Sequence, residues 1–327
     1  MRTLVVGAGA VGGYFGGRLA EAGGDVAFLV RPSRAAQLAE TGLQIESPHG
    51  NVVLEAKTLT PGALDGSYDV ILVCVKSYTL DEAICDIAPA VAGGTSVVPL
   101  LNGFGHIARL QQAFGDDRVL GGMCLITATL GPAGEIRHLL EPHELAFGEL
   151  CGGSSDRVEA IRSSWSGSKA KVRASSEIMQ DMWEKFAILA TTAGSTCLMR
   201  GCFGDILASP GGREGVLRLF SECTAVASAA GFPPRPAFLD FATRLITTEG
   251  SALKASMFRG IERGGRTEGD TYLATCSTRP ASTAWRRRPW SWRAAMWQLT
   301  RTRLDGRLCT LADNLAGAGW AYLAGPS

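Results

Sequence analysis

Three glycines near the N-terminus have the spacing of a phosphate-binding loop. Gly7, Gly9 and Gly12 follow a short apolar run, residues 3–6, and precede a stretch whose apolar residues are spaced as in a helix. In that context Gly7 permits a tight turn, Gly9 lets the backbone approach a pyrophosphate, and Gly12 lets the helix pack close to the strand. The helix N-terminus then offers free N–H groups and a positive dipole end to phosphate oxygens. The loop therefore predicts a bound dinucleotide.

The residue that ends the next apolar run distinguishes the two common dinucleotides. The run 25–30 (DVAFLV) predicts a second strand that leads into Arg31, with Arg34 close behind. An acidic residue at this point would bond the ribose 2′-hydroxyl, whereas an arginine accommodates a 2′-phosphate. Asp25 begins the strand and so lies at its far end from the ligand. The pattern favours NADP over NAD, although Arg31 alone would also suit a solvated surface.

The distribution of apolar runs predicts the fold class. The runs 68–75 and 96–101 are nearly continuous, as expected for parallel strands buried on both faces, and helical stretches lie between the runs. From about residue 178 the pattern becomes helical, with a turn at Gly231-Phe-Pro-Pro. We therefore predict an α/β protein with an N-terminal Rossmann doubly wound sheet and a C-terminal all-helical domain.

Three segments follow from this change of pattern. We predict an NADP-binding Rossmann domain over 1–172, a helical substrate and catalytic domain over 173–272, and an atypical tail over 273–327.

Bulk composition excludes several classes of protein. The 327 residues are 46% hydrophobic and 19% charged, with a net charge of +1, which predicts a globular protein and points to neither nucleic acid nor membrane as a partner. No run approaches the roughly 18–20 apolar residues that span a bilayer. The nine cysteines are scattered without a CxxC pair, which is typical of reduced thiols in a cytoplasmic protein.

The histidines do not predict a metal site. His138 and His143, with Glu141 and Glu144, match no common metal-ligand spacing, and the stretch HLLEPHE suggests a turn before a strand.

Several motifs in a fixed order carry a resemblance to a known family. They are GAGAVGG at 7–13, CVKS at 74–77, LLNG at 100–103, WEKF at 183–186 and SMFRGIERGGRTEGD at 256–270. Over residues 1 to about 272 the chain resembles the ketopantoate reductase (2-dehydropantoate 2-reductase) family. One glycine loop would indicate only a dinucleotide, but the ordered set is specific to the family.

The resemblance assigns roles to five further residues. It implies that Lys185 donates a proton to the substrate carbonyl oxygen and that Glu268 assists this lysine. It places Ser256 on the substrate, Lys76 beside the nicotinamide, and Asn102 beside both. It also implies an active site between the two domains, and homodimerisation is a family-level expectation. Without the resemblance, Lys185 would be taken for a surface lysine.

The chain departs from the family at three positions after Lys185. Where the family often carries asparagines that hold the substrate, this chain has Leu189, Ala193 and Phe203, which cannot replace an amide's hydrogen bonds. The substrate is therefore expected to be 2-dehydropantoate or, by a paralogous activity, another 2-oxo acid or a bulkier ketone.

The tail is a second departure. Seven arginines and no acidic residue lie between 279 and 303, with tryptophans at 285, 290, 292 and 297. Such a segment could bind nucleic acid by charge and stacking. We favour a shifted reading frame, because back-translating 274–288 and reading the shifted frame gives DMLDKARKHGVATP, which suits the family. Resequencing the gene tests this hypothesis.

These observations predict an NADPH-dependent enzyme that reduces a small 2-oxo acid, nominally 2-dehydropantoate to (R)-pantoate in pantothenate biosynthesis. A paralogous reductase and a non-catalytic NADPH-binding protein are the alternatives.

Overall fold

The structure is a computed structural model that describes residues 1–64 and 66–269. The predicted tail over 273–327 lies outside the described residues. The chain divides into two compact units, the first formed by residues 1–187 and 224–238 and the second by 188–223 and the described residues from 239 onward. The domain limits expected from the sequence stay predictions.

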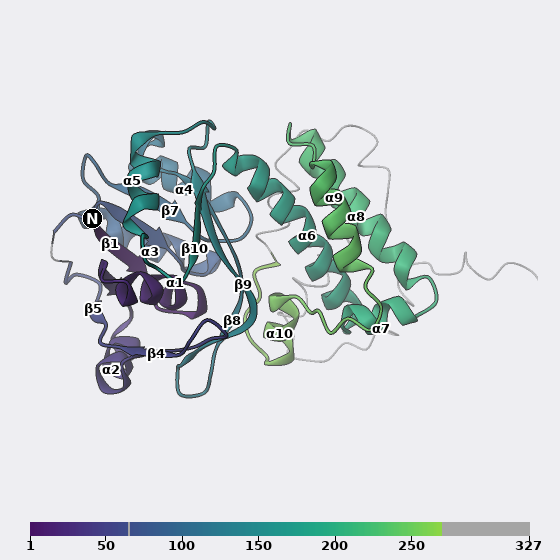
Figure 1. Ribbon diagram of the computed structural model, residues 1–327, viewed down its shortest axis with the longest axis horizontal. Coiled ribbons are helices and arrows are strands. Elements are labelled where there is room, and N and C mark those ends of the chain that lie inside the picture. The colour runs from purple at the N-terminus through teal and green to yellow at the C-terminus, as the bar shows by residue number, and fades with distance from the viewer. Residues whose placement is uncertain (65, 270–327) are drawn as a thin grey trace, which may run out of the picture. The chain divides into compact units, whose positions relative to one another are not determined.

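Unit 1 contains a five-stranded parallel sheet (Figure 1). Its strands are β1 (Arg2–Val6), β2 (Asp25–Leu29), β5 (Lys57–Leu59), β6 (Val70–Val73) and β7 (Ser96–Pro99), in the order β5-β2-β1-β6-β7. Counted along the chain, this order is 3-2-1-4-5, so the direction of winding reverses between β1 and β6. Ligands of open α/β sheets bind at such a reversal, outside the carboxyl ends of the strands.

Both faces of this sheet are buried by apolar clusters. Because successive side chains of a strand point to opposite sides, one strand contributes to both clusters. In β1, Val5 packs into one apolar cluster, while Leu4 and Val6 pack into another. The first cluster includes α1 (Ala10–Glu21) and α5 (Asp156–Ser164). The second includes α3 (Leu80–Ile87) and α4 (Gly105–Phe114). The predicted doubly wound sheet is confirmed.

Local sequence explains where α2 (Pro32–Thr41) begins and ends. Pro32 is its first residue, where the missing N–H costs nothing and the fixed φ suits a helix. Gly42 follows the helix with a φ of 70°, a left-handed conformation that glycine adopts without steric strain.

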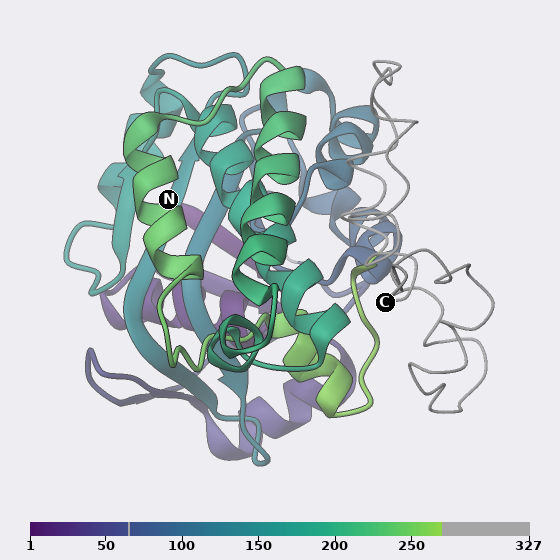
Figure 2. The same cartoon turned by 90° about the vertical axis from the view of Figure 1, so that its right-hand side faces the viewer.

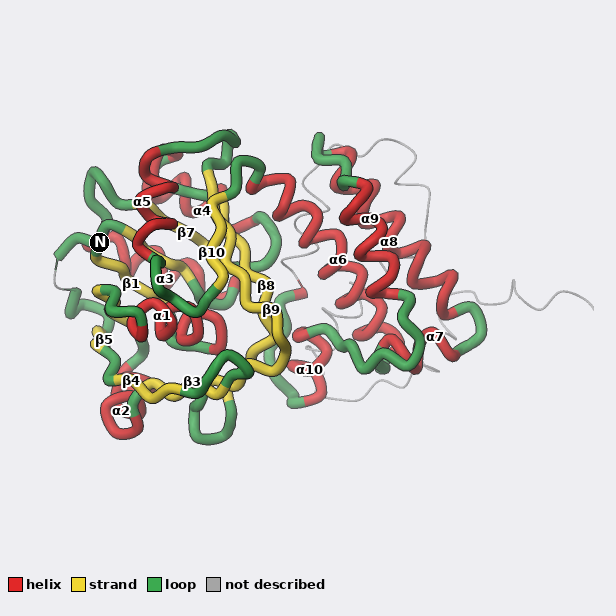
Figure 3. The backbone as a smooth tube through the Cα atoms, viewed as in Figure 1, coloured by secondary structure: helices red, strands yellow, loops and turns green. Residues whose placement is uncertain are grey.

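A second sheet lies in unit 1 that the sequence did not predict. It has the order β10-β9-β3-β4, with β8 also paired to β9; the bounds are β3 (Leu43–Glu46), β4 (Val52–Leu54), β8 (Gly121–Leu130), β9 (Ile136–Gly148) and β10 (Lys171–Ala174). Figure 3 shows β8 and β9 running side by side.

One expectation was wrong in this sheet. The stretch HLLEPHE is not a turn before a strand but lies inside β9. The pairing with β8 jumps there, because Ile126 pairs with His143 and Ala128 pairs with His138. Residues 139–142 therefore bulge out of the ladder, which accounts for turn-like sequence inside a strand.

Unit 2 is helical in its described part (Figure 2). The helices of the C-terminal region are α6 (Ile178–Met199), α7 (Phe203–Ala208), α8 (Gly212–Ala229), α9 (Pro236–Ile246) and α10 (Ser256–Glu262). Of these, α6 and α9 begin in unit 1, and α8 ends there. A methyl group on Gly194 of α6 would lie 2.9 Å from Leu219 of α8, so the missing side chain allows these helices to pack closely. The predicted helical region is confirmed. Among the described residues, no helix has both the length and the apolar character that a membrane span requires.

Candidate functional site

The glycine loop has the shape that its sequence predicts. Gly7 has a φ of 95°, and the backbone N–H of Gly7 bonds the carbonyl of Leu29 at the end of β2. A Cβ on Gly12 would lie 2.1 Å from the carbonyl oxygen of Gly7 and 2.8 Å from the Cβ of Cys74, so no side chain fits there. A Cβ on Gly9 would meet nothing within 4 Å. The open space at Gly9 is what a ligand approaching the backbone requires.

The end of this loop is also the start of a helix. Gly9 is the N-cap of α1, and no side chain caps the helix. The first N–H groups of α1 are therefore left for other partners, and the sheet's winding reverses at the same strand. This arrangement suits an anionic phosphate.

The two arginines after β2 differ in their surroundings. Arg31 is 70% exposed and its Nη2 lies 3.1 Å from the Oε2 of Glu82 in α3. Arg34 is half-buried: its Nε donates to the carbonyl oxygen of Ala8 at 3.2 Å, and its Nη1 donates to Gln37 at 2.6 Å. The Nη2 atom of Arg34 is buried without a hydrogen-bond partner. Arg34 thus lies against the glycine loop with one donor unused, whereas the sequence assigned the 2′-phosphate to Arg31 and noted Arg34 only as its neighbour.

Lys76 and Asn102 follow the carboxyl ends of neighbouring strands. Lys76 comes three residues after β6 and is exposed, whereas Asn102 comes three residues after β7 and is half-buried. Because β1, β6 and β7 are adjacent and parallel, both residues are at the same edge of the sheet as the glycine loop. Their roles toward a ligand stay predictions.

Lys185 lies in the second turn of α6 among buried aromatic residues. Its side chain is partly buried, and within 1–64 and 66–269 no carboxylate forms an ion pair with it. Trp183 stacks on Phe104 with ring centroids 4.2 Å apart, and Phe186 lies 5.8 Å from the same ring. The loop after β7 is therefore packed against the turn of α6 that carries Lys185.

A buried histidine lies in the same region, and sequence reasoning missed it. His106 is the second residue of α4 and is 4% exposed. Burial, and then the charge of Lys185, lower the pKa of His106 to about 3. Its imidazole is therefore neutral at physiological pH. The only signal in the sequence was its position four residues after Asn102, which matches no motif.

Ser256 and Glu268 belong to unit 2. Ser256 is the exposed first residue of α10, and Glu268 is half-buried six residues after that helix. The chain before α10 is held within the unit, because the N–H of Ala255 bonds the hydroxyl of Thr196 at 3.3 Å and the N–H of Phe203 bonds the carbonyl of Leu253 at 3.1 Å. The approach of Ser256 and Glu268 to Lys185 stays a prediction.

The three apolar residues that stand where the family often has asparagines differ in their exposure. Leu189 keeps some exposed surface, whereas Ala193 and Phe203 are buried. The Phe203 ring is fully enclosed at the start of α7. Of the three, Leu189 is the side chain best able to meet a ligand.

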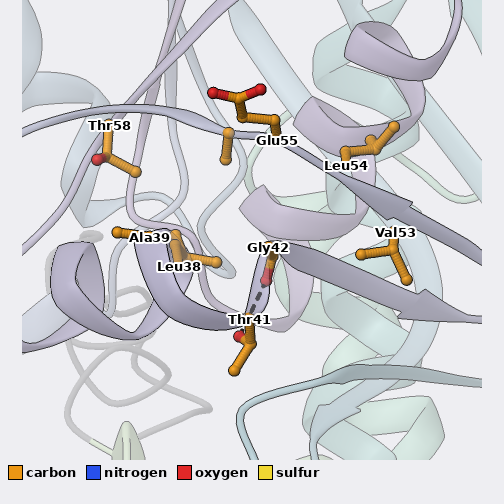
Figure 4. Close-up of a pocket in the computed structure, with 9 residues that line it drawn as sticks. Leu38, Ala39, Thr41, Gly42, Val53, Leu54, Glu55 and Thr58 are labelled. Atoms are coloured by element: carbon orange, nitrogen blue, oxygen red, sulfur yellow. Dashed lines mark hydrogen bonds between the residues drawn. The ribbon is translucent and has the colours of Figure 1, made fainter.

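A cavity of about 430 Å³ lies elsewhere in unit 1 (Figure 4). It is lined by Leu38 and Thr41 at the end of α2 and by Val53, Leu54 and Glu55 on the strand side. It is lined by no arginine, lysine or histidine. This cavity does not suit a nucleotide phosphate and lies at the opposite end of α2 from Arg31.

Known proteins match this chain over most of its length. The family described as "Ketopantoate reductase PanE/ApbA" matches residues 3–152, and its C-terminal part matches residues 177–277. The chain belongs to the ketopantoate reductase family. The chain is similar to the "Uncharacterized oxidoreductase YkpB" of Bacillus subtilis, which is 41% identical over 270 residues, 83% of this chain and 89% of the relative.

Other relatives carry the family's name. A 2-dehydropantoate 2-reductase of a Nostoc species is 25% identical over 70% of this chain and 73% of its own length. The crystal structure of a 2-dehydropantoate 2-reductase from Geobacter metallireducens has a TM-score of 0.81 and 26% identity, and covers 92% of this chain and 100% of the other. The fold therefore agrees with that of ketopantoate reductases.

Proposed function

We propose that this ketopantoate reductase family member uses NADPH to reduce the carbonyl of a 2-oxo acid to a hydroxyl group. One set of features in unit 1 supports the proposal. The glycine loop excludes a side chain at Gly12, Arg34 keeps an unused donor beside that loop, and Lys185 is partly buried without an ion-pair partner among the described residues.

The residues of unit 1 fit a dinucleotide with a 2′-phosphate. The N–H groups around Gly9 and the start of α1 would hold the pyrophosphate, and Arg31 with Arg34 would hold the 2′-phosphate. Lys76 and Asn102 would lie beside the nicotinamide. When bound, NADPH supplies the hydride that adds to the substrate carbonyl carbon.

In the proposed mechanism, Lys185 completes the reduction. As the carbonyl carbon gains a hydride, negative charge develops on the oxygen, and an ammonium group stabilises that charge. Lys185 then donates a proton to the oxygen, so the carbonyl becomes a secondary alcohol. Ser256 would bond the substrate, and Glu268 would assist Lys185 in regaining a proton.

The nominal substrate is 2-dehydropantoate, which would give (R)-pantoate for pantothenate biosynthesis. A different 2-oxo acid or ketone is the second candidate, and the side chains favour it. Leu189, Ala193 and Phe203 offer no hydrogen bonds to a hydroxyl or carboxylate, and a site without them favours a less polar substrate.

Two further expectations belong with this proposal. The seven cysteines of the described residues are free thiols, which supports a cytoplasmic location. Assembly as a homodimer is proposed on the family resemblance alone.

Consumption of NADPH by the purified full chain tests the function, with 2-dehydropantoate and a series of 2-oxo acids of increasing apolar size. Lys185→Ala should lower kcat about 10²- to 10⁴-fold, the range for a lost general acid. Lys171→Ala is the matched control, since Lys171 is an exposed lysine in β10 that pairs with Glu144. Equal rates for the two variants would reject Lys185 as the acid. NADPH binding without turnover on any substrate would identify a non-catalytic binding protein.

A further inference from the structure

His106 is a buried histidine to which the proposed reaction assigns no role. It begins α4 just after Asn102 and is almost completely enclosed. Its Nε2 atom is buried and has no hydrogen-bond partner in the described structure. Buried polar atoms are nearly always paired in proteins, so an unpaired one requires an explanation.

The surroundings of His106 connect it with Lys185. Phe104, two residues before His106, stacks on Trp183, two residues before Lys185. Ile107, the residue after His106, packs with Met182 in one apolar cluster. Contacts on both sides of His106 thus join the start of α4 to the turn of α6 that carries Lys185. The charge of Lys185 acts on the imidazole, which agrees with this proximity.

A neutral imidazole suits an ammonium group as a neighbour. Its unprotonated nitrogen accepts a hydrogen bond, while an ammonium has three donors and no acceptor. A carboxylate in the same place would form an ion pair that competes with the developing charge on the substrate. The long lysine side chain has many rotamers, so a fixed acceptor lowers the entropy cost of orienting it.

We propose that His106 is a positioning residue for Lys185: its Nε2 accepts a hydrogen bond from the ammonium through one bridging water and orients that group toward the carboxyl edge of the sheet. This role requires the tautomer that is protonated on Nδ1. It rests on the proposed function, because Lys185 is taken to be the proton donor.

Two amide variants separate this role from packing. The amide of His106→Gln can place an oxygen near the position of Nε2, whereas the shorter His106→Asn places it near Nδ1. His106→Gln should keep kcat within about threefold of the wild type. His106→Asn and His106→Leu should lower kcat about 10- to 100-fold, as expected for a misdirected acid. The KM for NADPH should change little in all three.

The pH profile gives a readout that packing does not move. In His106→Leu and His106→Asn, the pH at which kcat declines on the basic side of the pH–rate profile should shift. In His106→Gln it should stay the same. Loss of activity to the same degree in all three variants, with that pH unchanged, would show a structural role and overturn the proposal. Unchanged activity in all three would overturn it too.

A measurement without turnover separates failure of this proposal from failure of the proposed function. The chain has four histidines, so their ¹⁵N signals can be assigned in the full-length protein. The Nε2 signal of His106 should show an unprotonated nitrogen and should move in Lys185→Met but not in Lys171→Met. A signal that is the same in both variants would reject the contact. A shift specific to Lys185→Met in a protein that reduces no oxo acid would uphold the contact and reject the reaction.

Discussion

Arg235 neutralises two buried carboxylates at the start of α6, and its removal should destabilise unit 1. Its Nη2 bonds Asp181 and Glu184, each at 2.6 Å, and its Nε bonds Glu184 at 2.9 Å. The side chains of Asp181 and Glu184 are only 8% and 7% exposed. In Arg235→Leu, Asp181 would keep bonds from Arg173 and Ser175, while Glu184 would keep bonds from Gln180 and the backbone N–H of residue 235.

The expected loss is at the low end of the range for a broken buried ion pair. Such losses are about 3–5 kcal/mol, and we expect ~3 kcal/mol here because Arg235 is itself half-exposed and both carboxylates keep other partners. For a unit of this size, 1 kcal/mol corresponds to about 2–4 °C, so the transition should fall by about 6–12 °C.

The loss should also depend on pH. Burial raises the pKa of Asp181, but hydrogen bonds from Ser175, Arg235 and Arg173 outweigh it, so the pKa is lower than usual in the folded protein. Stability from this group is therefore present above the ordinary aspartate pKa and is lost as pH falls through the lower, folded value. The difference between wild type and Arg235→Leu should be full at pH 7 and shrink in acid.

Calorimetry at several pH values measures this effect. Arg162→Leu is the control, because Arg162 forms an exposed pair with Glu159 whose loss should cost at most about 1 kcal/mol. The double variant Arg235→Leu/Glu184→Leu should recover part of the stability, since it removes an unpaired buried charge. A transition for Arg235→Leu within 2 °C of that for Arg162→Leu, or no recovery in the double variant, would refute the reasoning.

Three further predictions concern unit 1. Gly12→Ala should weaken NADPH binding at least about tenfold, or about 1.4 kcal/mol, because the new Cβ would lie 2.1 Å from the Gly7 carbonyl oxygen. Fluorescence titration measures this loss. As a control, Gly215→Ala should leave binding unchanged, because a Cβ there meets nothing within 4 Å. Arg34→Gln should weaken binding of NADPH about 10-fold more than binding of NADH, and an equal effect on both would exclude contact with the 2′-phosphate. Burial and two neighbouring histidines lower the pKa of His143 to about 4, so the stability it contributes is present above pH 6.5 and falls toward pH 4. In His143→Phe the melting temperature should therefore depend less on pH between pH 6.5 and pH 4. The same pH dependence in this variant and the wild type would show that His143 does not contribute it.

Much of the parallel sheet could be predicted because most of its strands are continuous apolar runs. The runs that became β1, β2, β6 and β7 are apolar on both faces, and glycine or polar residues end each run. The glycine loop was predicted for the same reason, since its geometry depends on residues that adjoin one another. Local pattern was enough wherever the determining contacts are local.

The second sheet was not predicted, because the local pairs β3 with β4 and β8 with β9 are joined into one sheet only by distant pairings. β9 pairs in parallel with β3 and with β10, which lie far from it in the sequence, and the bulge at 139–142 breaks its alternation. His106 was missed for a similar reason. Its setting depends on Phe104 meeting Trp183 across nearly eighty residues of chain, and nothing in the neighbouring sequence marks it.

The composition of unit 1 from two stretches of chain has a consequence for synthesis on the ribosome. Residues 224–238 supply Arg235 to Asp181 and Glu184, and Phe232 to a stacked contact with Trp183 at 6.2 Å. The nascent N-terminal portion therefore emerges with Asp181, Glu184 and Trp183 each lacking one of its final partners, which is made some fifty residues later. Final consolidation of this unit must wait until residue 238 has left the exit tunnel, and a gene truncated after the parallel sheet would yield a product prone to aggregation.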